Sequence, residues 1–107
     1  MSQANPPIET LPAIAAPWQD IVLTCRKCTR KLDGGFGPKR RLSLREMLKA
    51  GLRAAGMRRQ FRVVEIGCLG LCPKNAVTLV RASRPGVMLR VPAGAAFDAL
   101  LPVLLAE

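Results

Sequence analysis

The cysteines of this chain constrain its fold more than any other feature. There are four, in two tight pairs: Cys25 with Cys28, and Cys68 with Cys72. Each pair follows an apolar, β-branched run typical of a buried strand, and a long amphipathic segment separates the two runs. A right-handed crossover of this kind makes the two strands parallel and brings their carboxyl ends to one edge of a sheet. Four thiols at the edge where open α/β sheets carry their sites favour a tetrathiolate metal centre.

From residue 20 to the second cysteine pair, the sequence predicts a strand at 20–24, a loop, a helix and a second strand at 60–66. Glycine and proline at 34–38 make residues 29–42 too glycine-rich for a helix. Ser43 is a candidate N-cap, and Glu46 completes a capping box. The helix should end near Gly56, a residue suited to a C-terminal turn. Its inward face is predicted to hold Leu44, Met47, Leu48, Leu52 and Ala55.

The C-terminal third predicts a β-hairpin and a last helix. Residues 75–80 and 87–91 read as two strands around a turn at 83–86. Residues 94–105 form an apolar helix that tolerates Pro102 only with a kink or an early end. The resulting βαββα order predicts an α/β fold of the thioredoxin-like arrangement, with a mixed four-stranded sheet and helices packed on it.

The chain's 107 residues fit one domain with a modest core. Residues 1–17, rich in proline and alanine, predict a flexible N-terminal arm, and the folded domain is expected over 18–107. No leader segment is visible, and no apolar run reaches the length of a membrane span. We therefore expect a cytoplasmic protein without a membrane partner, and in that reducing compartment the thiols should stay reduced.

Four interpretations of the cysteines stay open at this point. Core-filling cysteines would be scattered, not paired at two strand ends. A dithiol redox couple would place Cys25 and Cys28 at a helix N-terminus, where we expect a glycine-rich loop instead. A structural zinc site needs four thiolates, which the pairs supply. A [2Fe–2S] cluster binds two cysteines per iron, and the leucines beside Cys68 and Cys72 would shield it from water.

The second cysteine loop also carries a family resemblance. The run Gly67-Cys68-Leu69-Gly70-Leu71-Cys72-Pro73-Lys74-Asn75-Ala76-Val77 resembles the second cluster loop of the thioredoxin-like [2Fe–2S] ferredoxins. The chain is also similar, over roughly residues 20–107, to small bacterial metal-binding proteins of that type. The resemblance implies an iron–sulfur protein engaged in electron transport. It assigns Cys25 and Cys28 to one iron and Cys68 and Cys72 to the other.

Positive charge is the second informative feature. Lys and Arg outnumber Asp and Glu by 17 to 7, a net charge of +10. Many of these cations follow the first cysteine pair, and the candidate docking residues are Arg26, Lys27, Arg30, Lys31, Lys39, Arg40 and Arg41. Cations near a cluster should raise its reduction potential and steer an acidic redox partner towards it. Nucleic acid is a second candidate partner, although aromatic residues for base stacking are scarce.

The sequence excludes several other functions. It contains no histidine, so a Cys-His nucleophile, a mixed Cys/His zinc site and a Rieske-type cluster are not available within the chain. Its acidic residues are scattered singly, and no catalytic constellation is present, so we expect an electron carrier and not an enzyme. The alternative is a zinc-binding module whose basic face binds nucleic acid or an acidic protein. A homodimer is left open.

Overall fold

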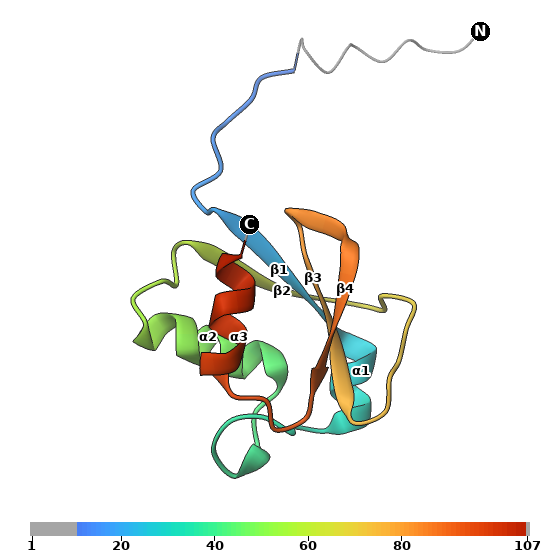
Figure 1. The fold of residues 1–107 in the computed structure, drawn as a ribbon. Helices are drawn as coiled ribbons and strands as arrows, with labels where there is room; N and C mark the ends of the chain where they lie inside the picture. Colours follow the sequence, from blue (N-terminus) through green and yellow to red (C-terminus); the bar gives the residue numbers. More distant parts are fainter. Residues whose placement is uncertain (1–10, 107) are drawn as a thin grey trace, which may run out of the picture.

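The computed structural model describes residues 11–106, which form an open, mixed sheet with helices packed on it (Figure 1). The expected α/β class and the mixed four-stranded sheet are confirmed. The strands are β1 (Asp20–Cys25), β2 (Phe61–Ile66), β3 (Ala76–Arg81) and β4 (Arg84–Pro92). The helices are α1 (Arg26–Leu32), α2 (Leu44–Ala54) and α3 (Phe97–Leu105), with a 3₁₀ turn, η2 (Pro38–Arg40), between the first two.

The strand order is β2-β1-β3-β4. β1 and β2 are parallel, in a register that runs from Asp20 opposite Phe61 to Cys25 opposite Ile66. β3 runs antiparallel to both β1 and β4. The register therefore brings Cys25 and the start of the second cysteine loop to the same edge of the sheet, as the crossover predicts.

The capping box of α2 is confirmed. The Ser43 hydroxyl accepts a hydrogen bond from the Glu46 N–H at 3.1 Å, and the Glu46 carboxylate accepts one from the Ser43 N–H at 2.9 Å. Gly56 follows the helix with a φ of +72°, the left-handed conformation expected of it. The predicted inward face is buried except at Ala55, which is exposed because the helix ends one residue before it.

The prediction of a loop over 29–42 is wrong in its first part. A helix, α1, begins directly after Cys25 and contains Cys28. It ends where Asp33 takes a left-handed conformation with a φ of 53°, and Gly34 and Gly35 follow, also with positive φ. The glycines therefore terminate a helix upstream of them and do not prevent it.

The predicted hairpin and last helix are confirmed with shifted ends. β4 begins at Arg84, so the turn is shorter than the expected 83–86. Pro85 fits within β4 because β4 is an edge strand and Pro85 has no partner in its register with β3, which is irregular between Val80 and Arg81. α3 begins at Phe97, three residues later than expected, and it contains Pro102 close to its end at Leu105.

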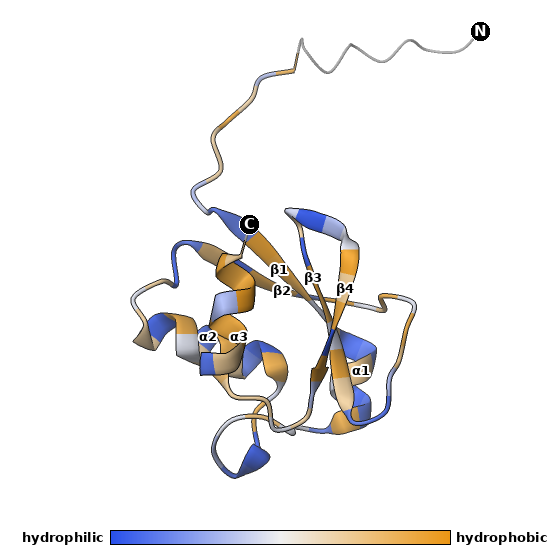
Figure 2. Cartoon of the chain, viewed as in Figure 1, coloured by the Kyte–Doolittle hydropathy of each residue, from blue (hydrophilic) through white to orange (hydrophobic). Residues whose placement is uncertain are grey.

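The core lies between the sheet and the pair α2 and α3. α2 and α3 are in direct contact, since a Cβ atom added at Gly51 would come within 2.3 Å of the Phe97 ring. The largest fully buried apolar side chains include Leu48, Leu52 and Leu79. Figure 2 shows hydrophobic residues along the strands and in α3, and hydrophilic ones in η2, α1 and the β3–β4 turn.

The predicted N-terminal arm is described only in part. Residues 11–17 lie in neither helix nor strand and are exposed, whereas residues 1–10 of the arm lie outside the described residues. Trp18 is half-buried, and the Arg62 guanidinium lies over its ring at 5.7 Å. Within residues 11–106, every helix is too short to serve as a candidate membrane span.

Candidate metal centre

The first cysteine pair lies at the junction of β1 and α1. Cys25 is the N-cap of α1, and its Sγ atom accepts a hydrogen bond from the Cys28 backbone N–H at 3.4 Å. Both residues are buried, with Cys25 fully enclosed and Cys28 2% exposed. The Thr78 hydroxyl of β3 lies 3.8 Å from the Cys28 Sγ atom. These two thiols are therefore fixed by regular structure on both sides.

The second cysteine loop lies against this first pair. The Lys27 N–H donates to the Gly67 carbonyl at 3.1 Å, which joins the first turn of α1 to the end of β2. The Cys28 thiol lies 3.6 Å from the Leu71 carbonyl, and the Cys25 thiol 3.9 Å from that of Gly67. The two loops predicted to carry ligands thus meet at one edge of the sheet.

Cys72 shares an environment with Cys28. Both residues line a cavity of about 260 Å³, together with Lys31 and Lys74. Cys72 is half-buried and also borders an apolar cavity of about 240 Å³ beside Met88. The second pair therefore contributes one thiol to the neighbourhood of the first.

Cys68 differs from the other three cysteines in its exposure. It is exposed, and its Sγ atom accepts a hydrogen bond from the Gly70 N–H within its own loop at 3.3 Å. The loop has open space around it here, because a Cβ atom added at Gly67 or Gly70 would meet no atom within 4 Å. Among residues 11–106, no three Cys, Asp or Glu side chains lie close enough together to hold one metal ion.

The donor set fits a thiolate-bound metal in its chemistry, but within residues 11–106 the thiols do not converge on a common centre. All four cysteines are free thiols at one sheet edge, and no histidine competes for the site. Cys25 and Cys28 are buried and Cys72 is half-buried, whereas Cys68 is exposed, so the second loop has to change its conformation before all four thiols can bind one centre.

The electrostatics of the site separate Cys25 from Cys72. Burial raises the pKa of Cys25, but hydrogen bonds from the Cys28 and Leu69 backbone N–H groups, with smaller contributions from the Cys28 and Thr78 side chains, outweigh it and lower the pKa to about 7. Burial and the neighbouring Cys28 thiol raise the pKa of Cys72, although Lys27 and Lys31 oppose that shift. The lowered pKa therefore favours the thiolate form of Cys25.

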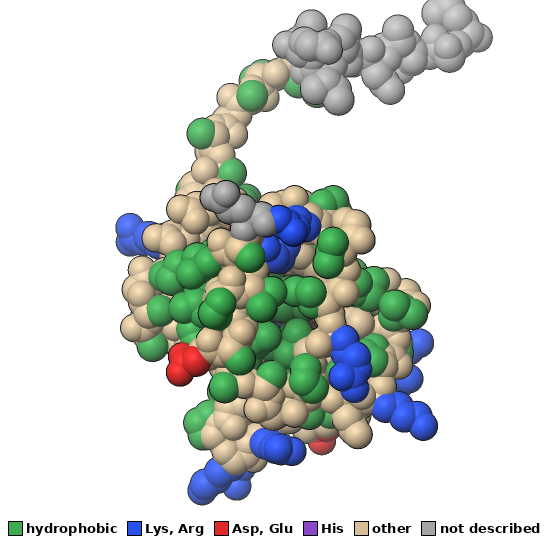
Figure 3. Space-filling model, in the orientation of Figure 1, with side chains coloured by type: hydrophobic (Ala, Val, Ile, Leu, Met, Phe, Trp, Pro, Cys, Tyr) green, Lys and Arg blue, Asp and Glu red, His purple; other side chains and the backbone are tan. Residues whose placement is uncertain are grey.

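The structure places the candidate docking residues on α1 and η2. Arg26, Lys27, Arg30 and Lys31 belong to α1, Lys39 and Arg40 to η2, and Arg41 follows it. All seven are exposed, and Arg26 forms an ion pair with Glu65 at 3.3 Å. On the face seen in Figure 3, Lys and Arg side chains lie at the periphery around a hydrophobic middle.

Sequence reasoning overstated the shielding by leucine and missed two neighbours of the thiols. Leu69 packs against the core, but Leu71 is 61% exposed and shields nothing in this conformation. The Thr78 hydroxyl was missed because Thr78 lies 50 residues after Cys28 in the sequence. Only the pairing of β3 with β1 brings the two residues together, and no local sequence pattern predicts that pairing. The Leu69 N–H was missed because backbone donors carry no sequence signal.

Comparisons with protein-family models, with curated proteins and with solved structures gave no match to this chain. The function of this chain therefore has to be inferred from its own residues.

Proposed function

We propose that this chain is an iron–sulfur protein of thioredoxin-like fold that holds one [2Fe–2S] cluster through Cys25, Cys28, Cys68 and Cys72 and carries single electrons. The observation that carries the proposal is the meeting of the two cysteine loops, joined by the hydrogen bond from the Lys27 N–H to the Gly67 carbonyl. The strand order β2-β1-β3-β4, with a parallel pair and a C-terminal hairpin, agrees with the thioredoxin-like arrangement.

When bound, such a cluster accepts and returns one electron. The residues of this chain would hold it and adjust its charge balance. The N–H groups of Cys28 and Leu69, which favour the thiolate of Cys25, would also stabilise added negative charge on that sulfur. Lys31 and Lys74, in the cavity beside Cys28 and Cys72, would act in the same direction. Both effects favour the reduced form and raise the potential.

A dithiol redox couple is the second candidate, because Cys25 caps a helix and has a lowered pKa. This observation removes the sequence-based objection to such a couple. However, Cys25 is fully buried, and thiol–disulfide exchange requires that a substrate reach the attacking sulfur. The cluster proposal also accounts for the second pair, which a single redox couple leaves without a role.

The decisive experiment is purification of the full chain without oxygen, followed by an absorption spectrum and analysis for iron and acid-labile sulfide. We expect red-brown protein with iron and sulfide in near-equal amounts. Colourless protein with stoichiometric zinc would support the zinc-binding module instead. Metal-free protein with a Cys25–Cys28 disulfide would support the dithiol couple.

Two variants test the ligands. Cys68→Ser should lose the cluster even though Cys68 is the most exposed of the four thiols, because the remaining cysteines cannot complete both irons. Thr78→Val is the matched control, since it removes a hydroxyl 3.8 Å from the Cys28 Sγ atom but no ligand. The control should keep its cluster at a lower potential. A Cys68→Ser protein with an unchanged spectrum would remove Cys68 from the ligand set.

The partner that suits this carrier is an acidic redox protein. The exposed cations of α1 belong to the helix that contains Cys28, where they would draw a negatively charged surface towards the cluster. The same cations would also attract nucleic acid, which is the partner of the alternative zinc-binding module.

A further inference from the structure

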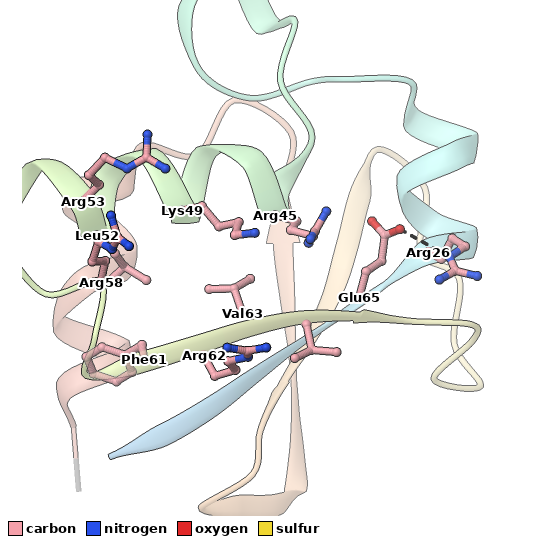
Figure 4. A pocket seen from close by; sticks show the side chains of 11 residues that line it. Arg26, Arg45, Lys49, Leu52, Arg53, Arg58, Phe61, Arg62, Val63 and Glu65 are labelled. Atoms are coloured by element: carbon pink, nitrogen blue, oxygen red, sulfur yellow. Dashed lines mark hydrogen bonds and ion pairs between the residues drawn. The ribbon is translucent and has the colours of Figure 1, made fainter. Parts of the chain in front are cut away.

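A basic groove of about 610 Å³ lies between α2 and β2, away from the cavities beside Cys28 and Cys72 (Figure 4). Six cations line this α2–β2 groove: Arg26, Arg45, Lys49, Arg53, Arg58 and Arg62. Of its described lining residues, Glu65 is the only acid, and it is already paired with Arg26. The floor is apolar and is formed by Leu52, Phe61 and Val63.

Most of these cations have no carboxylate partner within residues 11–106. The ion pairs described there are Arg26 with Glu65 and Arg81 with Asp20. In addition, the Nε atom of Arg45 is buried and has no hydrogen-bond partner. A buried donor without a partner is unfavourable, as is a concentration of like charge around one groove. An anionic occupant would offset both costs.

The shape of the groove indicates what kind of anion fits. β2 is an edge strand, and its outer side pairs with no described strand. The lining includes every residue from Phe61 to Glu65, so both faces of β2 contribute to it. The groove therefore follows the edge of the strand along its length. Unpaired backbone N–H and C=O groups of an edge strand accept a further strand. An extended polypeptide with acidic side chains would meet both the backbone groups and the guanidinium groups.

We propose that the α2–β2 groove binds an extended acidic segment of a partner protein, which adds to the sheet as a strand along β2. At about 3.3 Å per residue, the length of β2 accommodates about six residues of such a segment. The inference concerns the polypeptide surface alone and does not depend on the metal.

Charge and aromatic content decide against two other occupants. A second copy of this chain would bring the same six cations against the groove, so repulsion opposes pairing of two β2 edges. Nucleic acid would supply phosphates, but its bases would find little to stack on. Phe61 is 5% exposed, and the Trp18 ring is covered by the Arg62 guanidinium.

The test is fluorescence anisotropy with a labelled peptide of alternating Glu and Val residues, titrated with the full-length protein at low and high salt. The groove variant Lys49→Glu/Arg53→Glu/Arg62→Glu should weaken binding about tenfold or more, since three attractive charges become repulsive. The control variant Arg30→Glu/Lys31→Glu/Lys39→Glu has the same change in net charge at exposed positions outside the groove. It should bind within about threefold of the wild type, as only long-range attraction is lost.

Three further measurements test strand addition, the choice of a protein partner and independence from the cluster. The same peptide with alternate backbone amides methylated keeps its charge but loses strand pairing, and it should bind at least about tenfold more weakly. Equal binding of the two peptides would overturn strand addition. Tighter binding of single-stranded oligo-dT than of the peptide, lost in the groove variant, would overturn the choice of a protein partner. Peptide binding is measured beside the iron and sulfide content of the same protein, so the groove can fail or succeed independently of the cluster.

Discussion

The backbone N–H of Cys28 donates to the Cys25 Sγ atom across 3.4 Å, so the first turn of α1 is built around a sulfur acceptor. An oxygen-bearing side chain is the usual acceptor at this position of a helix. Here the cap is also a proposed metal ligand. The start of α1 and the chemistry of Cys25 are therefore linked, and a change in one should be visible in the other.

The Cys25 thiol should titrate near neutral pH in the metal-free protein. Its pKa is about 7 instead of the ordinary 9.0, because the hydrogen bonds from Cys28 and Leu69 outweigh the opposing effect of burial. The ultraviolet absorbance of thiolate should show a step near pH 7 that disappears in Cys25→Ser. A lowered pKa in the folded state stabilises the fold above the ordinary value and loses that stabilisation as the pH falls through 7. The metal-free protein should therefore become more stable between pH 7 and 9, and a flat profile would contradict this.

The four thiols should differ in reactivity before the metal binds and become alike afterwards. In metal-free protein, Cys68 should be alkylated first because it is exposed, whereas Cys25 and Cys28 are buried. After reconstitution with iron and sulfide under anaerobic conditions, all four should be protected. Mass spectrometry of peptides after brief iodoacetamide treatment measures this directly. If Cys68 stays reactive while an iron–sulfur spectrum develops, it is not a ligand.

Much of the fold was predictable because its signals are local. The capping box of Ser43 and Glu46, the glycine after α2 and the apolar runs of β1 and β2 each report their own element. The helix α1 was not predictable in the same way. Its cap is a cysteine, and Gly34 and Gly35, which suggested a loop, lie beyond its end. These two glycines follow the end of α1, and their closeness to residues 29–32 led to the wrong expectation of a loop there.

The candidate site was also predictable only in part. Parallel pairing of β1 and β2 requires that both cysteine pairs come to one edge, so their approach could be predicted from strand order alone. The outward position of Cys68 could not, because it depends on loop geometry at Gly70. The α2–β2 groove was also missed. Its cations come from α1, from α2, from β2 and from the segment between α2 and β2, and only packing brings these together.

Asp20 should be the most sensitive acidic residue for stability. Its buried carboxylate accepts hydrogen bonds from the Ile21 N–H, the Ser83 N–H and hydroxyl and the Arg81 guanidinium, which ties the start of β1 to the β3–β4 turn. Burial alone raises its pKa, but the bonds from Ser83 lead those that lower it below 3.8.

Asp20→Asn should lower the free energy of unfolding by about 3 kcal/mol, the range for breaking a buried charge pair. Chemical denaturation measures this, with the exposed Asp98→Asn as the control that should change little. The contribution of Asp20 is present above the ordinary pKa and is lost as the pH falls through the lowered one. The difference between wild type and Asp20→Asn should therefore shrink below about pH 4. A constant difference down to acidic pH would show that the charge of Asp20 is not what stabilises the turn.

The cations of α1 and η2 should govern electron exchange with an acidic partner. Arg30→Glu/Lys31→Glu/Lys39→Glu should slow exchange about tenfold at low salt and flatten its salt dependence, because steering acts within a Debye length of about 10 Å at 0.1 M. Cluster content should be unchanged, since these side chains are exposed and are not proposed ligands. Stopped-flow reduction of an acidic redox protein at several salt concentrations measures the effect.

The groove variant Lys49→Glu/Arg53→Glu/Arg62→Glu is the control of equal charge and should slow exchange less. A lowered reduction potential with unaltered partner kinetics would mean that these cations adjust the potential of the cluster and do not attract the redox partner. Salt-sensitive binding of nucleic acid that is lost in the same variant would instead favour the nucleic-acid partner.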